Sequence, residues 1–270
     1  MPYNLTLLAH QKGIKRNITL RPIVPTKAQA QDLYAIYAPI IALWQAAVPK
    51  IMAGYEKRPL VDGMTLDTAD DMQREIDAAA SEMSRIVVML TPRLQQWALR
   101  FEKWHRNKWV GAIYTATNID MAMMLTTQPV QETIGSFIAR NVALMKDISA
   151  QTQGRISDIV FREYQNRTPA REVAKQLNEA VGLGKKRALR VAADQSQKLS
   201  AGLDLERHAE AGIEQYRWRH SGKAHPRIEH KARDGKLYDL NKPEGDQPGY
   251  APYCGCKAQA YLPILDEFGL

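Results

Sequence analysis

The chain has 270 residues, of which 45% are hydrophobic, and carries 37 Lys and Arg against 29 Asp and Glu, a formal net charge of +8. This length and apolar content suffice for a sizeable core divided among two or three subdomains. Two cysteines are too few for a disulfide framework and fit a reducing compartment. Residues 1–13 show no signal-peptide pattern, and the longest apolar-rich stretch, residues 39–49, is too short to cross a bilayer. We therefore expect neither secretion nor a membrane span.

The amino-terminal residues 1–25 contain no acidic side chain. Within them, residues 17–24 (Asn-Ile-Thr-Leu-Arg-Pro-Ile-Val) favour an extended segment or one strand. Two interpretations stay open for this arm. It docks on a neighbouring subunit, or it is a loosely tied terminus.

From Thr26 to about residue 212, apolar residues recur at the spacing of amphipathic helices. Residues 57–66 carry a proline and a glycine and predict a linker after the first helix. Because proline lacks a backbone N–H and glycine weakens a helix, we expect further interruptions. The expected kinks, breaks or ends are at Pro39, Pro49, Thr91-Pro92, Gly154 and Gly182-Leu183-Gly184.

Residues 216–256 differ from the rest of the chain because they contain both cysteines and three of the six histidines. Residues 215–218 alternate polar and aromatic side chains, which is typical of a half-buried strand. Asp234-Gly235 predicts a tight turn into a second strand. Three prolines and two glycines between residues 243 and 252 predict a loop.

The pattern Cys254-Gly255-Cys256 allows three arrangements. A disulfide between the two would close a very small ring with poor geometry. Alternatively, two reduced thiols pack in a small core. In the third arrangement they bind a structural zinc, which takes a tetrahedral set of thiolates and imidazoles, with His230 and either His225 or His220 completing the set.

The order of residues in this stretch resembles a known family. It runs Tyr216-x-Trp218, Ser221-Gly222, His225-Pro226-Arg227, His230, Asp234-Gly235, a proline-rich loop and Cys254-x-Cys256. It looks like the carboxy-terminal module of phage head-morphogenesis proteins, the minor head proteins typified by protein F of phage Mu. The resemblance covers about residues 155–260 and includes the helical run from Arg187 to Gln195. Two departures are Lys223, where the family commonly has an acidic residue, and Ala193, where it commonly has an arginine.

These patterns predict a mainly α fold with an elongated helical body followed by a small α+β module. The expected regions are an amino-terminal arm (1–25), a first helical region (26–125), a central helical region (126–212) and the Mu F-like module (213–270). The module's structural residues would be Tyr216, Trp218, Ser221, Gly222, Asp234 and Gly235. Its metal ligands would be Cys254, Cys256, His230 and His225, holding one structural zinc and no other cofactor.

The resemblance implies a non-enzymatic minor capsid protein of a tailed phage, assembled in the bacterial host cytoplasm and located in the virion head. Its implied partners are the portal and capsid proteins, and its implied roles are head assembly, DNA packaging or ejection. Residues 183–236 carry 13 Lys and Arg against 7 Asp and Glu, and a basic face of this kind suits nucleic acid, such as double-stranded DNA, or an acidic protein ring. A solvated surface without a partner is the alternative interpretation of the same charges. The candidate nucleic-acid or partner contacts are Arg187, Arg190, Arg217, Arg219 and Arg227. A metal-dependent nuclease and a DNA-binding accessory factor are the alternatives.

Overall fold

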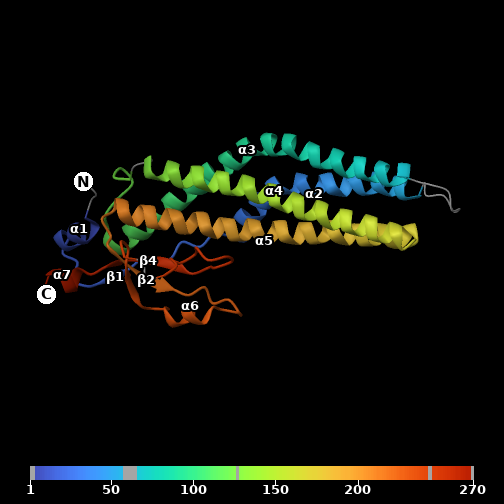
Figure 1. The fold of residues 1–270 in the computed structure, drawn as a ribbon. Coiled ribbons are helices and arrows are strands. Elements are labelled where there is room, and N and C mark those ends of the chain that lie inside the picture. Colours follow the sequence, from blue (N-terminus) through green and yellow to red (C-terminus); the bar gives the residue numbers. More distant parts are fainter. Residues whose placement is uncertain (1–3, 57–65, 126–127, 243–244, 269–270) are drawn as a thin grey trace. The chain divides into compact units, whose positions relative to one another are not determined.

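Long helices account for most of this computed structural model, which describes residues 4–56, 66–125, 128–242 and 245–268. The four long helices are α2 (Lys27–Glu56), α3 (Leu66–Thr117), α4 (Gln128–Gln165) and α5 (Ala170–Glu210) (Figure 1). The shorter elements are α1 (Leu5–Gln11), α6 (Ile228–Ala232), α7 (Ile264–Phe268), β1 (Ile18–Thr19), β2 (Gln215–Arg219), β3 (Leu237–Asp239) and β4 (Lys257–Leu262). The prediction of a mainly α fold with a small α+β carboxy-terminal module is confirmed. The expected linker lies, but for its last residue, outside the described residues.

The helices continue through the prolines that were expected to break them. Pro92 lies inside α3, so the helix end predicted at Thr91-Pro92 is wrong. Pro39 and Pro49 lie inside α2, so of the kink or break predicted there the break does not occur. A proline leaves the carbonyl four residues earlier without its helical partner. Those earlier residues are Ala35, Gln45 and Val88, and all three are exposed. Water can therefore bond to each freed carbonyl, and packing of the helix's apolar face outweighs the lost hydrogen bond.

The glycines of α4 and α5 do not end these helices either. Gly154 lies inside α4, and Gly182 and Gly184 lie inside α5. A Cβ on Gly184 would come within 2.7 Å of Thr152 Oγ1, so this glycine permits a close helix crossing. The glycine that does follow the end of α5 is Gly212, with φ +63°, where a Cβ is disfavoured.

The chain forms two compact units, each assembled from segments far apart in sequence. The sheet unit comprises Met1–Gln29, Trp97–Phe137 and Asp194–Leu270, and the helical unit comprises Ala30–Gln96 and Ile138–Ala193. Helices α3, α4 and α5 contribute residues to both. The four consecutive regions named above remain a prediction about sequence organisation.

Helix α2 supplies much of the core of the helical unit. By length and composition alone it is the one helix among the described residues that could cross a membrane, although half of its most apolar stretch is buried inside the protein. Its Trp44 Nε1 donates a 2.9 Å hydrogen bond to Ser149 Oγ on α4, and the Tyr37 hydroxyl donates to Asn141 Oδ1 on the same helix. These contacts are those of a core helix.

The sheet unit contains one antiparallel sheet in the order β1-β4-β2-β3, so strands from both ends of the sequence lie side by side (Figure 1). Ile18 pairs with Leu262, and Trp218 pairs with Ala258. The predicted extended amino-terminal segment is therefore present, but it docks on this chain's own β4. The loosely tied terminus is therefore wrong for the paired residues, and docking on a neighbouring subunit remains a prediction. Side chains of β1 and β4 pack with Trp109 and Ile113 of α3 in one apolar core.

Candidate metal centre

The two cysteines lie immediately before β4, in a small core beneath the sheet. Strand β2 forms as predicted, and alternate residues Tyr216 and Trp218 face inward. Both aromatic side chains pack with Cys254, Cys256 and Ala258 in one buried cluster. Because β4 pairs directly with β2, the sheet register fixes where the two thiols lie.

His230 completes a cluster of three potential metal ligands. It lies on the short helix α6 and is only 2% exposed, while Cys254 and Cys256 are 4% and 2% exposed. Its Nδ1 is 3.4 Å from Cys254 Sγ and 3.7 Å from Cys256 Sγ. The ligand atoms of all three residues lie within 4.8 Å of one another. The Trp218 ring meets the imidazole edge to face, with centroids 5.1 Å apart, and so helps to fix its orientation.

The other imidazole nitrogen is held by a carboxylate that sequence reasoning did not identify. His230 Nε2 lies 3.0 Å from Asp246 Oδ2, and Arg233 donates a 3.0 Å hydrogen bond to Asp246 Oδ1. Arg233 also lies over the Trp218 ring, 5.0 Å from its centroid. A carboxylate on the outer nitrogen of a metal-binding histidine fixes its tautomer and increases its basicity. Asp246 lies in an irregular loop, where no sequence periodicity could have indicated its role.

These three residues fit a zinc ion in donor type and in spacing. Zinc–sulfur bonds of about 2.3 Å and zinc–nitrogen bonds of about 2.0–2.1 Å at tetrahedral angles place nitrogen and sulfur about 3.6 Å apart. The separations between His230 Nδ1 and the two sulfurs, 3.4 and 3.7 Å, bracket that value. The site thus offers three of the four ligands of a tetrahedral zinc.

The two thiols shift each other's pKa in opposite directions. The hydrogen bond from the Cys256 thiol, with further bonds from the backbone N–H of Cys256 and Gly249 and from His230, lowers the pKa of Cys254 to about 5 despite its burial. The same hydrogen bond between the two thiols, together with burial, raises the pKa of Cys256. Both cysteines are free, so the structure does not contain the disulfide between Cys254 and Cys256 that was one of the three possible arrangements.

The remaining predicted histidines lie outside this cluster. His225 is exposed, in the surface segment before α6, so the structure does not bring the predicted fourth ligand to the site. The Nδ1 of His220 instead accepts a 3.1 Å hydrogen bond from the Gly222 N–H. The source of a fourth ligand is therefore not among the histidines proposed from the sequence.

The other motif residues shape the turns of the module. Gly222 and Gly235 have φ of +69° and +81°, a conformation that favours glycine. Asp234 Oδ1 accepts a 2.8 Å hydrogen bond from the His220 N–H, and the Gly235 N–H donates to Trp218 O. The turn predicted at Asp234-Gly235 leads into β3 as expected. Ser221 is partly buried beside Gly255.

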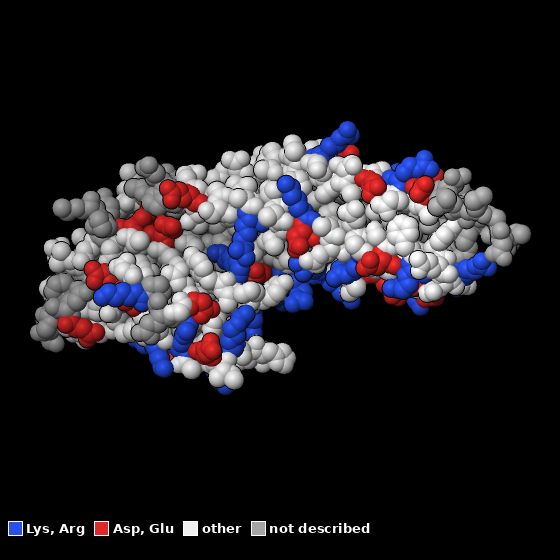
Figure 2. Space-filling view, viewed as in Figure 1, with Lys and Arg blue, Asp and Glu red and all other residues white. Residues whose placement is uncertain are grey.

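The five basic residues predicted as contacts interact mostly with this chain's own groups. Arg187 pairs with Asp147 at 2.7 Å, and Arg219 pairs with Asp234 at 3.6 Å. Arg227 donates to Pro252 O, and Arg217 donates to Gly235 O. Two of the five, Arg187 and Arg190, belong to the helical unit and the others to the sheet unit. On the face shown in Figure 2, blue basic and red acidic side chains are interspersed.

Together, the fold and the site define a mainly helical protein whose small carboxy-terminal module contains a buried thiol–imidazole cluster. Residues 155–259 match the family model described as "Phage Mu protein F like protein". The resemblance seen in the sequence is thereby confirmed for this segment, which supports a phage Mu protein F-like family of head-morphogenesis proteins. The matched segment contains the whole candidate centre, from His230 to Cys256.

The chain is also similar to an uncharacterized protein of Haemophilus influenzae (strain ATCC 51907 / DSM 11121 / KW20 / Rd). The two are 31% identical over 154 residues, which cover 56% of this chain and 34% of the relative. The chain therefore spans about a third of the length of the curated relative it matches. No solved structure matches the chain significantly.

Proposed function

We propose that this chain is a minor capsid protein of a tailed phage that associates with the portal or the capsid interior and assists head assembly, DNA packaging or ejection. The family match over residues 155–259 is the observation that carries this proposal. The long helices supply surface for protein partners, and the sheet module supplies a fixed end. The protein acts in the phage head, after assembly in the host cytoplasm.

The proposed role is structural, and the burial of the candidate centre supports this. Each of its three residues is at most 4% exposed, so a DNA phosphate has no direct path to an ion held there. Among the described residues, no carboxylate joins the three as a candidate ligand, and Asp246 is engaged with His230 and Arg233. A hydrolytic metal site needs an accessible position for water and substrate.

We further propose that one zinc ion bound by Cys254, Cys256 and His230 stabilises the module. The ion would supply cross-linking alone, tying α6 and its loop to the start of β4. The Cys254→Ser/Cys256→Ser variant should then melt at a lower temperature, with no specific loss of DNA binding. His225→Ala is the matched control for His230→Ala, because only the second removes a ligand. An unchanged melting temperature in the double variant would contradict the proposal.

Co-purification tests the assembly role. The full chain is expressed with the portal and the major capsid protein encoded in the same phage or prophage genome, and each is affinity-purified in turn. We expect the chain to co-purify with one of them and to be present in few copies in isolated heads by quantitative mass spectrometry. Its absence from both would contradict the proposal.

The nuclease alternative keeps one supporting observation, since three protein ligands leave one zinc position open. It predicts cleavage of supercoiled plasmid that depends on a divalent cation and is abolished by His230→Ala. A DNA-binding accessory factor would instead bind duplex DNA without cleavage, with affinity that falls steeply as salt rises. We expect no cleavage by the wild-type chain.

A further inference from the structure

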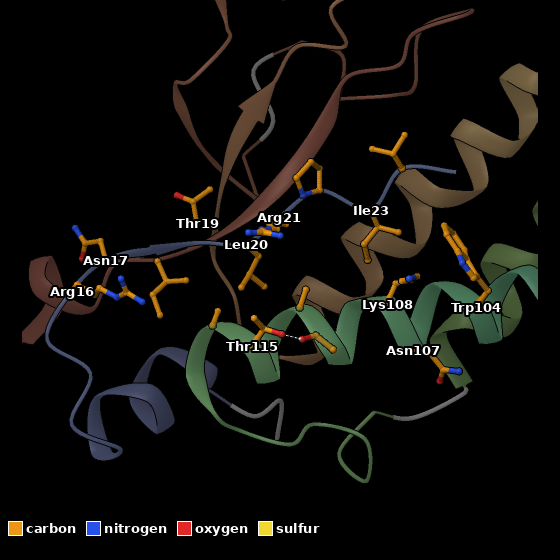
Figure 3. A pocket seen from close by; sticks show the side chains of 16 residues that line it. Arg16, Asn17, Thr19, Leu20, Arg21, Ile23, Trp104, Asn107, Lys108 and Thr115 are labelled. Atoms are coloured by element: carbon orange, nitrogen blue, oxygen red, sulfur yellow. Dashed lines mark hydrogen bonds between the residues drawn. The ribbon is translucent and has the colours of Figure 1, made fainter. Parts of the chain in front are cut away.

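An open groove of about 870 Å³ lies in the sheet unit and shares no lining residue with the candidate metal centre. Residues 16–24 form one wall and residues 104–116 of α3 form the other. Figure 3 shows the amino-terminal segment running past α3, with Arg16, Arg21 and Lys108 among the lining side chains. None of the residues that form either wall belongs to the candidate metal centre or to the segment that matches the family model.

The first wall is an edge of the sheet. Strand β1 is terminal in the order β1-β4-β2-β3, and the Leu20 N–H donates a 2.9 Å hydrogen bond to Ala260 O. In an antiparallel ladder, backbone groups of alternate residues point to the same side. The N–H and C=O groups of Thr19, which lies between Ile18 and Leu20, therefore point away from β4. An edge of this kind is a template for an added strand.

The second wall leaves room beside that edge because its side chains are small. Gly111, Ala112, Thr115 and Ala116 recur on one face of α3. Thr115 Oγ1 bonds back to Gly111 O, so this hydroxyl is already engaged within the helix. From residue 104 to residue 116 the helix rises about 18 Å. Five or six residues of an extended strand, at about 3.3 Å each, cover that length.

The positive charge of the groove favours an occupant that carries negative charge. Arg16, Arg21 and Lys108 are exposed, and no Asp or Glu is among the lining residues described. The whole stretch 1–25 also lacks acidic residues. An occupant with carboxylates on alternate residues would place them near these three cations while its backbone pairs with β1.

We propose that this groove binds an extended, acidic peptide segment of a partner protein, which adds as a fifth strand along the free edge of β1. Main-chain hydrogen bonds would supply affinity, and the three cations would select acidic side chains, as in other strand-addition complexes. The proposal does not depend on the role in head assembly, since it rests on the edge strand, the small residues of α3 and the charges alone.

The test uses fluorescence polarisation with the full chain and labelled hexapeptides in which Val or Thr alternates with Glu. We expect saturable binding to some of these peptides, at least tenfold weaker binding when Lys replaces Glu, and similar weakening when a central residue becomes Pro. Failure of every acidic hexapeptide to bind at millimolar concentration would overturn the proposal. So would equal binding of the Lys peptides, or preferential binding of a labelled dT oligonucleotide that the peptides cannot displace.

Two pairs of variants locate the binding. A Cβ on Gly111 meets nothing within 4 Å, so Gly111→Leu fills the groove without overpacking the core. It should weaken peptide binding at least tenfold, whereas Gly135→Leu, at an equally open helix position outside the groove, should not. Lys108→Glu should likewise weaken binding, whereas Lys103→Glu on an exposed position of the same helix should not. Binding that survives both Gly111→Leu and Lys108→Glu would overturn the assignment.

Discussion

The sheet unit buries more titratable side chains than the helical unit does. The buried polar groups described in the helical unit are mostly neutral, as in Asn141, Ser149 and Thr152, which are hydrogen-bonded along or between helices. The charged one is Glu163, which accepts hydrogen bonds from Arg162 and Thr168. The sheet unit buries more titratable or charged groups: Glu102, His105, Asp204, Arg207, His208, His230 and Lys257. The stability of a buried charged group depends on the oppositely charged groups that it contacts. The stability of an apolar core depends mainly on how completely its side chains fill the available volume. The two units should therefore respond to different perturbations.

The largest effect is expected at Arg207, which is fully buried in the sheet unit. It donates to Glu102 Oε1 and, at 2.5 Å, to Glu210 Oε2. Arg207→Ala would remove the buried cation that both carboxylates share, leaving Glu102 with the more distant Arg106 at 3.7 Å. It should lower the free energy of unfolding by about 3–5 kcal/mol, measured by urea denaturation. Arg74→Ala, which removes a 73% exposed side chain paired with Asp71, should cost only about 0.5 kcal/mol. Equal losses in the two variants would show that burial of the charge is not decisive.

A second effect should appear on acidification. Burial lowers the pKa of His208 from 6.5 to about 4, with Asp204 opposing this shift and His105 adding to it. The unfolded chain then takes up a proton on this histidine between about pH 6.5 and 4, while the folded chain does not, so stability falls as pH falls. The part due to His208 is about 3 kcal/mol once pH is below 4.

The measurement is urea denaturation across this pH range. His208→Gln, which cannot titrate, should show a shallower loss of stability than the wild type between pH 6.5 and 4. The exposed His225 provides the control substitution, His225→Gln. A His208→Gln slope equal to that of the wild type would mean that other groups govern the acid sensitivity.

The smallest effects are expected in the helical unit, at two glycines of α5. Replacing each by alanine should change the stability in opposite directions. Gly184→Ala would push a methyl group to within 2.7 Å of Thr152 Oγ1, which is held by its bond to Ile148 O. The cost should be about 1–3 kcal/mol. Gly182→Ala meets nothing within 4 Å and should stabilise by about 0.5–1 kcal/mol through helix propensity. Thermal unfolding of both variants tests this; destabilisation by Gly182→Ala would contradict it.

Sequence reasoning predicted the helical class and the module because these depend on local periodicity and turn residues. The alternation around Trp218 and the turn at Asp234-Gly235 both gave the expected elements. It failed where tertiary packing decides the outcome. Pro92 and Gly184 each predict a helix end from the local sequence. The carbonyl that Pro92 leaves without a helical partner is on an exposed residue, so α3 continues. Gly184 within α5 permits a close helix crossing.

Part of the candidate site could also be predicted. Cys254, Cys256 and His230 were named as ligands because zinc binds thiolates and imidazoles, and the structure brings them together. The contact between His230 and Asp246 was not foreseen, because a loop has no spacing rule. The pairing of Ile18 with Leu262 joins residues from opposite ends of the chain, which no local pattern can indicate.

Zinc content most directly tests whether the sheet unit depends on a specific bound partner rather than on volume alone. Elemental analysis is made on the purified full chain, the Cys254→Ser/Cys256→Ser variant and the His225→Ala control. We predict about one zinc per chain in the wild type and the control, and none in the double variant. A wild-type protein that contains no zinc, with both thiols free to react under native conditions, would contradict a metal-fixed module and leave Cys254 and Cys256 as packing residues.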